Sequence, residues 1–425
     1  MPNKGIHAFR GQRILLLQGP VGPFFQRLAR DLERADATVF KVNFNAGDWF
    51  FYRRDAVNFR GPMSQWPSYL ADLLERLDID LVLLFGDCRG IHQVAREVAE
   101  ARGIQVGVFE EGYLRPHFVT LEPHGVNAHS LLPRNPVTYL NQADLPAFER
   151  EDLGNPYWYM VWWGFWYFLM GSLGAVAFPH YRHHRRLSVL EVIPWLRSVW
   201  RKHLYAHRES RLMGEFTERW DNRFFLVPLQ VFNDSQVVVH SDYSSVQAFI
   251  EEVMTSFALH APQDTALVIK HHPMDRGYTD YSRLIRDLAR RLRITNRCYY
   301  VHDQHMPTLL RHARGVVVIN STTALQSLQY GVATKVMGRA LFDLQGLCHK
   351  GTLDQFWNET ERSRPQRRLL NQFVRHLVMH AQINGNFYRA PQLPGETTGL
   401  RWHGYHWRHL TAHHRTEAST QRNAA

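Results

Sequence analysis

The stretch ALVIKHHP, residues 266–273, decides the fold class, because it joins an apolar run directly to a cluster of polar side chains. Residues 315–323, GVVVINSTT, repeat this arrangement further along the chain. A continuous apolar run is typical of a strand that is buried on both faces of a parallel sheet. Ligands bind at the carboxyl ends of the strands in such sheets. The two stretches therefore predict an α/β fold with polar residues gathered at one sheet edge.

The polar residues at these two strand ends suit a phosphate group. Lys270 and a protonated His272 supply positive charge, while Ser321 and Thr322 supply hydroxyl groups. A helix that starts near Ala324 would add backbone N–H groups, which attract anions. Each motif alone is also typical of a basic loop or an ordinary helix N-cap. Their order along one chain favours a nucleotide-sugar site.

Strand-like and helix-like segments alternate in both halves of the chain. The expected strands are residues 14–17, 38–42, 81–85, 106–109, 224–228, 266–269, 299–301, 316–319 and 334–337. The expected helices are residues 24–34, 69–77, 94–101, 246–255, 281–291, 306–312 and 324–330. Alternation of this kind is typical of a parallel sheet covered by helices on both faces. We expect two Rossmann-like domains that face a cleft, a GT-B-like architecture.

The chain of 425 residues is long enough to hold two hydrophobic cores. We assign residues 1–150 to an acceptor-side domain and residues 216–395 to a domain that binds a nucleotide sugar. Residues 151–215 form an aromatic and basic insertion between them, and residues 396–425 form a basic tail.

A net charge of +11 indicates an anionic partner, such as a nucleotide or an anionic membrane surface. Nucleic acid is the weaker choice, because the sequence has no zinc-finger, RNP or basic-zipper pattern. Three widely spaced cysteines match neither a disulfide framework nor a metal-ligand spacing. The N-terminus lacks the apolar segment of a signal peptide. We therefore expect a cytoplasmic protein. The sequence shows no Asp-x-Asp pair in a setting that would demand a metal, so we expect no metal or other cofactor.

Residues 157–170, YWYMVWWGFWYFLM, open an aromatic segment without charges that runs to residue 178. The segment is long enough for a transmembrane helix of about 20 residues. Tryptophan and tyrosine, however, concentrate at the membrane–water interface. The basic residues 180–186 that follow suit anionic head groups. We expect a segment that lies on the membrane surface; the alternatives are a buried helix pair between the domains and a true span.

Carboxylates supply candidates for catalysis. Glu110 and Glu111 directly follow an expected strand, where a raised pKa of one of them would suit general acid–base chemistry. Ion pairing with Arg115 is the structural alternative. Asp234 lies within the amide-rich stretch QVFNDSQ, residues 230–236, which would orient an ionised nucleophile. It is equally typical of a helix N-cap or a turn.

Loops that follow the early strands supply candidates for the acceptor side. Gly19 and Gly22 follow the first strand, where glycine lets a backbone approach a ligand closely. Asn45 and Asp48 follow the second strand, and residues 86–87 follow a later one. We expect these three polar loops to converge on one sheet edge.

Taken together, these motifs resemble the capsule polysaccharide biosynthesis family, and within it the retaining β-Kdo transferases of the KpsS/LipB type. The matching segments are residues 19–25, 43–49, 110–116, 230–236, 270–273, 320–325, 342–347 and 351–357. The sequence departs from the expected pattern at residues 331–334, GVAT, where such folds often carry Gly-x-Pro.

The resemblance implies transfer of β-Kdo from CMP-Kdo to lysophosphatidylglycerol or a similar anionic lipid. The product would be the lipid linker that primes capsular polysaccharide for export. The protein would act on the inner face of the cytoplasmic membrane, beside other capsule assembly proteins. Two alternatives stay open: a non-enzymatic export scaffold, and a GT-B transferase that uses another nucleotide sugar.

Retention of configuration implies a double displacement through a covalent intermediate. We assign Asp234 as the nucleophile and Glu111 or Glu110 as the base for the acceptor hydroxyl. The expected CMP-sugar ligands are Lys270, His272, Ser321, Thr322 and Gln236, and the expected acceptor-side residues are Gly19, Gly22, Asn45, Asp48 and Arg115.

Overall fold

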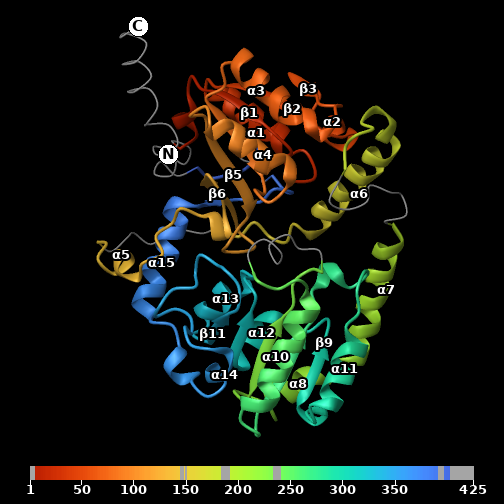
Figure 1. Cartoon of the computed structure of the whole chain (residues 1–425), viewed down its shortest axis with the longest axis vertical. Helices are drawn as coiled ribbons and strands as arrows, with labels where there is room; N and C mark the ends of the chain where they lie inside the picture. The colour runs from red at the N-terminus through yellow and green to blue at the C-terminus, as the bar shows by residue number, and fades with distance from the viewer. Residues whose placement is uncertain are drawn as a thin grey trace. The chain divides into compact units, whose positions relative to one another are not determined.

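The computed structural model describes residues 5–143, 148, 151–182, 192–232, 241–390 and 397–402. The chain forms two compact α/β units (Figure 1). The first comprises Met1–Leu131, Pro146–Val189 and Arg375–Ala425. The second comprises Leu132–Leu145 and Leu190–Val374.

The first unit contains a seven-stranded sheet in the order β3-β2-β1-β4-β5-β6-β12. The parallel strands are β1 (Arg13–Leu16), β2 (Thr38–Asn43), β3 (Ala56–Asn58), β4 (Leu81–Phe85) and β5 (Gln105–Glu111). The antiparallel strands are β6 (Phe118–Pro123) and β12 (Gln382–Asn384). The parallel part is doubly wound, and its strand order reverses between β1 and β4.

Alternate side chains of β1 supply the two cores of this unit. Ile14 and Leu16 pack on one face with α1 (Phe24–Arg34). Leu15 and Leu17 pack on the other face, with the remaining helices. Those helices are α3 (Trp66–Arg76) and α4 (Gly90–Glu100). This alternation follows from the two-residue period of a strand and explains the continuous apolar sequence.

The second unit contains a parallel five-stranded sheet in the order β11-β10-β7-β8-β9. Its strands are β7 (Phe224–Pro228), β8 (Ala266–Lys270), β9 (Cys298–Val301), β10 (Ala313–Val318) and β11 (Ala333–Val336). The order reverses between β7 and β10, so this sheet is also doubly wound. Both units therefore have the same arrangement of their five parallel strands.

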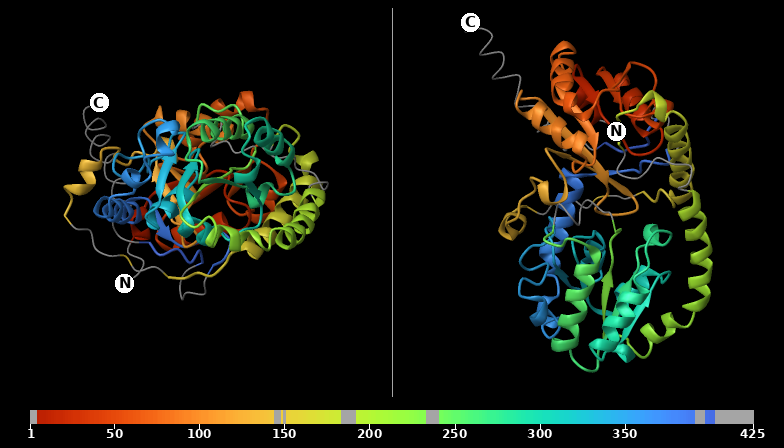
Figure 2. Two further views of the ribbon diagram at one scale, coloured as in Figure 1. Left: turned by 90° about the horizontal axis from the view of Figure 1, so that it is seen from below. Right: turned by 45° about the vertical axis from the view of Figure 1, so that its right-hand side comes forward.

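Four helices connect these strands in turn: α10 (Val246–His260), α11 (Ser282–Arg291), α12 (Met306–His312) and α13 (Thr323–Gln329). Among the described residues of this unit, α5 (Pro136–Leu140), α7 (Val192–Arg208) and α8 (Leu212–Thr217) precede the sheet, and α14 (Leu353–Phe356) follows it. Right-handed crossovers put α10 and α11 on one face of the sheet and α12 and α13 on the other. Helix α7 lies at the outer edge of this unit (Figure 2). Helix α15 (Arg367–His380) then returns the chain to the first unit.

Helix α6 (Tyr157–Leu173) is anchored in the first unit by one face. The hydroxyl of Tyr167 donates to Asp48 Oδ1 at 3.0 Å and accepts from Asn45 Nδ2 at 2.7 Å. Trp166 stacks on Phe50 of α2 (Ala46–Phe51), with ring centroids 6.0 Å apart. No helix among the described residues is long and apolar enough to cross a membrane.

The predicted α/β class with two Rossmann-like units is confirmed, and every predicted strand is present. The predicted contiguous domains do not coincide with the two units. The insertion at residues 151–215 is divided, since α6 belongs to the first unit and α7 to the second. Residues 375–395 return to the first unit, because β12 pairs with β6.

Part of the predicted basic tail, residues 396–425, lies in the core of the first unit. Leu400 and Trp402 are buried in the same core as β1. Thr397 and Thr398 donate their hydroxyl groups to the carboxylate of Asp31 on α1. Residues 403–425 lie outside the described part of the chain.

Candidate functional site

Polar residues gather at the carboxyl edge of the second sheet, where its strand order reverses. Asn320 follows β10, and its backbone N–H donates to the side-chain oxygen of Gln230, which follows β7, at 3.3 Å. Lys270 ends the neighbouring strand β8, and its carbonyl accepts from the N–H of Leu229. The structure thus brings the two predicted stretches to one edge, the place where open α/β sheets bind ligands.

Lys270 is the most constrained cation at this edge. Its side chain is only 4% exposed, and Nζ donates to the carbonyl oxygen of His302 at 3.1 Å. Burial lowers the pKa of Lys270 to about 8, while Asp303 opposes this shift. A bound anion would favour the charged ammonium, so the residue is suited to hold a phosphate group.

Three other predicted donor-binding residues, His272, Ser321 and Thr322, are half-buried in the loops that follow β8 and β10. His272 Nδ1 accepts from the N–H of Met274 at 3.2 Å, so a neutral ring carries its hydrogen on Nε2. The hydroxyl of Ser321 accepts from the N–H of Thr323 at 3.3 Å, and Thr322 directly precedes α13. Asp234 and Gln236 lie outside the described residues. The roles of these five residues stay predictions.

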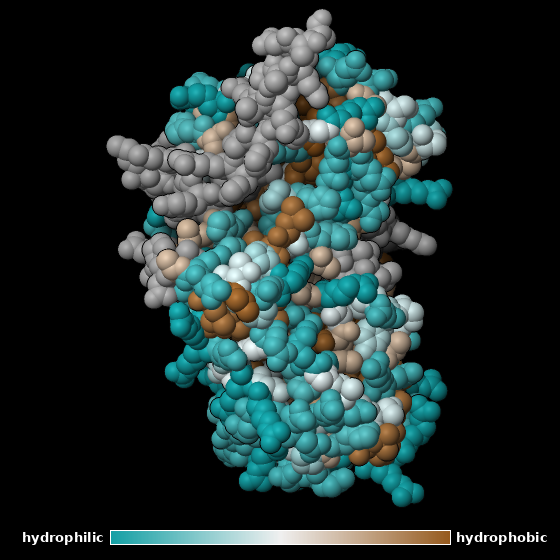
Figure 3. All heavy atoms as spheres, turned by 60° about the vertical axis from the view of Figure 1, so that its left-hand side comes forward, coloured by the Kyte–Doolittle hydropathy of each residue, from teal (hydrophilic) through white to brown (hydrophobic). Residues whose placement is uncertain are grey.

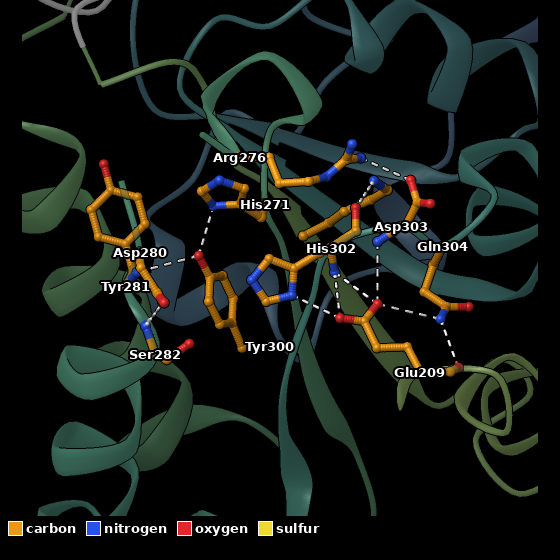
Figure 4. Close-up of polar contacts among 11 residues, drawn as sticks. Glu209, His271, Arg276, Asp280, Tyr281, Ser282, Tyr300, His302, Asp303 and Gln304 are labelled. Atoms are coloured by element: carbon orange, nitrogen blue, oxygen red, sulfur yellow. Dashed lines mark hydrogen bonds and ion pairs between the residues drawn. The ribbon is translucent and has the colours of Figure 1, made fainter. Parts of the chain in front are cut away.

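A buried polar network that the sequence analysis did not predict supports this edge (Figure 4). His271, 2% exposed, has its Nδ1 2.7 Å from the hydroxyl of Tyr300. Burial lowers the pKa of His271 to about 3, so the ring is neutral at physiological pH. Arg276 Nη2 contacts Asp303 Oδ1 at 2.8 Å and joins the loops that follow β8 and β9. Glu209 directly follows α7 and is far from these loops along the chain. No local pattern in the sequence predicts its contacts with them.

The first unit has a matching polar cluster where its own strand order reverses. Gln18 follows β1, and its Oε1 accepts from Nη1 of Arg89, which follows β4, at 2.9 Å. Gln18 Nε2 donates to Asp48 Oδ2 at 3.1 Å and to the hydroxyl of Tyr181 at 2.8 Å. The predicted residues Asn45 and Asp48 lie here, buried beneath α6. Their observed contacts anchor that helix, and a role toward an acceptor stays a prediction.

Packing explains the two glycines that were predicted to approach a ligand. Gly22 has a φ of +106°, and a Cβ there would lie 2.9 Å from Cβ of Trp163 on α6. A Cβ on Gly19 would lie 2.9 Å from the ring of Phe25. The space beside both glycines is therefore taken up by aromatic side chains of the same unit.

The two predicted carboxylates are the last two residues of β5, which extends two residues beyond the expected end at residue 109. A Cβ on Gly86 would lie 3.4 Å from Glu110 Oε2, so Glu110 reaches the loop after β4. Burial raises the pKa of Glu110 to about 7, and the charge of Glu111 adds to this shift. Glu111 Oε1 instead accepts from the hydroxyl of Tyr388 at 2.9 Å. Exposed Arg115 donates to the carbonyl of Gly112.

Glu110 is thus the better placed of the two glutamates for proton transfer near neutral pH. The sequence did not predict the contact between Tyr388 and Glu111, because Tyr388 reaches this edge only where the chain returns to the first unit after α15. No group of three or more His, Cys, Asp or Glu side chains suited to a metal ion occurs among the described residues.

Two doubly wound units with polar residues at their carboxyl edges define a protein of the α/β class with GT-B-like architecture. The chain belongs to the capsule polysaccharide biosynthesis protein family, whose model matches residues 80–388. The family resemblance seen in the sequence is therefore confirmed.

The chain is 43% identical over 380 residues to the capsule polysaccharide export protein KpsS of Escherichia coli, with 89% of this chain and 97% of that protein covered. It is 39% identical over 400 residues to the capsule polysaccharide modification protein LipB of Neisseria meningitidis serogroup A, covering 91% and 94%. Among solved structures, the KpsC beta Kdo 2,7 transferase of Thermosulfurimonas dismutans is 15% identical with a TM-score of 0.42, covering 88% and 92%.

Replacement of Glu110 by Gln tests the raised pKa through protein stability. The folded protein keeps a proton on Glu110 that the unfolded chain loses, so stability falls as the pH rises from about 4.5 through about 7. A glutamine side chain does not ionise, so Glu110→Gln removes this loss of stability at high pH. We expect Glu110→Gln to raise the melting temperature at pH 8 by about 2–4 °C and to leave it unchanged at pH 4.5.

The matched control is Glu97→Gln, a change on the exposed face of α4. It should leave the melting temperature unchanged at both pH values. An equal effect of Glu110→Gln at both pH values would contradict a raised pKa.

Proposed function

We propose that this protein is a glycosyltransferase that transfers β-Kdo from CMP-Kdo to lysophosphatidylglycerol or a similar anionic lipid. The product primes the lipid linker of capsular polysaccharide for export. The reaction retains the configuration of the sugar and requires no metal. The protein works as a peripheral component of the inner face of the cytoplasmic membrane.

The observation that carries the proposal is the polar edge of the second sheet within a chain of this family. Lys270 ends β8, and the hydroxyl groups of Ser321 and Thr322 follow β10; these two strands flank β7 in a doubly wound sheet. A cation and hydroxyl donors at such an edge suit a phosphodiester like that of a CMP-sugar. The names of the relatives, a capsule export protein and a capsule modification protein, support a substrate in capsule assembly.

The chemistry proceeds in two displacements. The carboxylate of Asp234 attacks the anomeric carbon of Kdo, and CMP leaves with the bonding electrons. The acceptor hydroxyl then attacks the same carbon and displaces Asp234, while Glu110 or Glu111 takes its proton. The pKa of Glu110, raised by burial to about 7, favours Glu110 for this second role. Lys270, His272, Ser321, Thr322 and Gln236 hold the phosphate during the first step.

The exposed apolar side chains support the membrane part of the proposal. Nineteen large hydrophobic residues are exposed among the described residues; seven of them lie at residues 157–176 and four lie on α7. Trp158 is 75% exposed and Trp200 is 63% exposed. By contrast, the face drawn in Figure 3 is largely hydrophilic, with small separate hydrophobic groups. Aromatic residues and basic residues without acidic neighbours suit an anionic lipid surface.

Turnover of CMP-Kdo with a fluorescent lysophosphatidylglycerol tests the reaction. The donor is generated in situ, and mass spectrometry identifies the product. We expect addition of Kdo to the lipid, and Asp234→Asn should reduce the rate by at least about a thousandfold, because it removes the nucleophile.

The control is Asp264→Asn, an exposed change in the same unit that should leave the rate unchanged. Full activity of Asp234→Asn would contradict the assignment of the nucleophile. Absence of product with intact donor and lipid would favour another nucleotide sugar or a non-enzymatic role in export.

Binding to lipid vesicles tests the membrane contact. The double change Trp158→Gln and Trp162→Gln removes two exposed rings that would enter the interfacial region. We expect binding to phosphatidylglycerol-containing vesicles to weaken by about tenfold or more. Leu259→Gln, an exposed apolar site on α10, is the control. Equal vesicle binding of all three proteins would contradict a contact through α6.

A further inference from the structure

One side of α7 and the residue that follows it carries a row of four polar or aromatic side chains. These side chains are Arg197, Arg201, Tyr205 and Glu209. Their spacing of four residues puts neighbours in the row on the same helix face. Every member of the row contacts a loop that follows β8 or β9 in the same unit.

The first half of the row holds the loop after β8. Arg197 Nη1 donates to the carbonyl of Gly277 at 3.3 Å, and Arg201 Nη1 donates to the carbonyl of Arg276 at 2.8 Å. A Cβ on Gly277 would collide with the carbonyl oxygen of Pro194 on α7. The helix and the loop therefore pack backbone against backbone.

The second half of the row holds the loop after β9 (Figure 4). The ring of Tyr205 stacks on His302, with centroids 3.6 Å apart and an interplanar angle of 6°. Glu209, 6% exposed, accepts from the backbone N–H groups of His302 at 2.9 Å and Asp303 at 3.2 Å. Its Oε1 also lies 2.7 Å from His302 Nδ1, which carries a hydrogen because a carboxylate only accepts.

The contacts continue from this loop to the phosphate-binding candidate. Glu209 holds His302 through three contacts. Both carboxylate oxygens accept from the backbone N–H of His302, and Oε1 also contacts ring Nδ1. Its carbonyl oxygen in turn accepts from Lys270 Nζ at 3.1 Å. The position of the Lys270 ammonium group thus depends on a carboxylate that lies outside the sheet.

We propose that Glu209 is a positioning residue that fixes the loop after β9 and, through the His302 carbonyl, the Lys270 ammonium group for binding of the donor phosphate. This inference rests on the proposed function, because it assumes that Lys270 binds the nucleotide. Glu209 itself touches neither the sugar nor the reacting atoms in this account.

A purely structural role of Glu209 would affect stability alone, whereas a positioning role also affects the charge of Lys270. Among the described residues, the charged groups that act on Lys270 are Asp303, Arg276 and Glu209. The ring of His302, whose carbonyl accepts from Lys270, packs against the rings of His271 and Tyr300. Asp303 and Glu209 raise the pKa of Lys270 and thereby offset part of the dominant lowering by burial. Loss of the Glu209 charge should therefore neutralise Lys270 at a lower pH.

Titration calorimetry with CMP between pH 6 and 9 tests the proposal. We expect the unchanged protein to bind CMP and to lose affinity as the pH rises through about 8, where Lys270 loses its proton. Glu209→Gln should bind CMP about tenfold more weakly at pH 7.5. The amide NH2 group is a donor and cannot accept from the N–H groups of His302 and Asp303, so the loop after β9 is held less firmly. Its loss of affinity should also begin at a lower pH.

Glu218→Gln, an exposed change in the same unit, is the matched control and should bind CMP like the unchanged protein. In steady-state turnover, Glu209→Gln should raise KM for the donor and leave KM for the lipid unchanged. If Glu209→Gln does not fold, Glu209→Asp replaces it: the shorter side chain keeps the negative charge but draws the carboxylate away from the donors of His302 and Asp303, so CMP should bind more weakly with an unchanged pH dependence.

The outcomes separate the two proposals. Equal CMP affinity and equal pH dependence of Glu209→Gln and the unchanged protein would overturn the positioning role. Absence of CMP binding by the unchanged protein would overturn the nucleotide site itself. Weaker binding with a shifted pH dependence supports both.

Discussion

Parallel pairing of β7 with both β8 and β10 is the constraint on which the rest of the second unit depends. This pairing reverses the strand order at one point and brings the loops after all three strands to the same edge. The register that puts Pro228 opposite Lys270 fixes the depth at which the lysine leaves the sheet. A shift by one residue would turn its side chain to the other face. The first unit has the same strand order but carries carboxylates and amides at its edge.

Burial gives the two edges their opposite chemical characters. Desolvation disfavours charge, so it lowers the pKa of a lysine and raises that of a carboxyl group. It brings the pKa of Lys270 down to about 8 and that of Glu110 up to about 7, both close to neutral pH. A buried cation suits the binding of an anion, and a buried carboxyl group near neutrality suits the transfer of a proton. The two edges thus carry ionisable groups of opposite kind, each with a pKa displaced by burial.

The sequence allowed prediction of the strands and of the polar loops, because apolar runs and the polar residues that end them are local features. It did not predict contacts made by segments that are distant along the chain. Glu209 reaches the loop after β9, and Tyr388 reaches Glu111, only through the tertiary fold. Leu400 and Trp402 belong to the first core although the surrounding composition is that of a polar tail. Asn45 and Asp48 were predicted as acceptor-side residues, and the structure shows that both also hold α6 through Tyr167. The sequence analysis had placed Tyr167 in a segment on the membrane surface and so did not predict this contact.

Hydrogen exchange with and without CMP tests most directly whether the second sheet edge binds the nucleotide. We expect slower exchange in the loops after β8, β9 and β10, residues 270–280, 301–305 and 319–324, when CMP is bound. Exchange at residues 18–22 and 86–90 of the first unit should not change. Protection of the first-unit loops, with unchanged exchange in the three loops of the second, would show that the nucleotide does not bind at the second sheet edge.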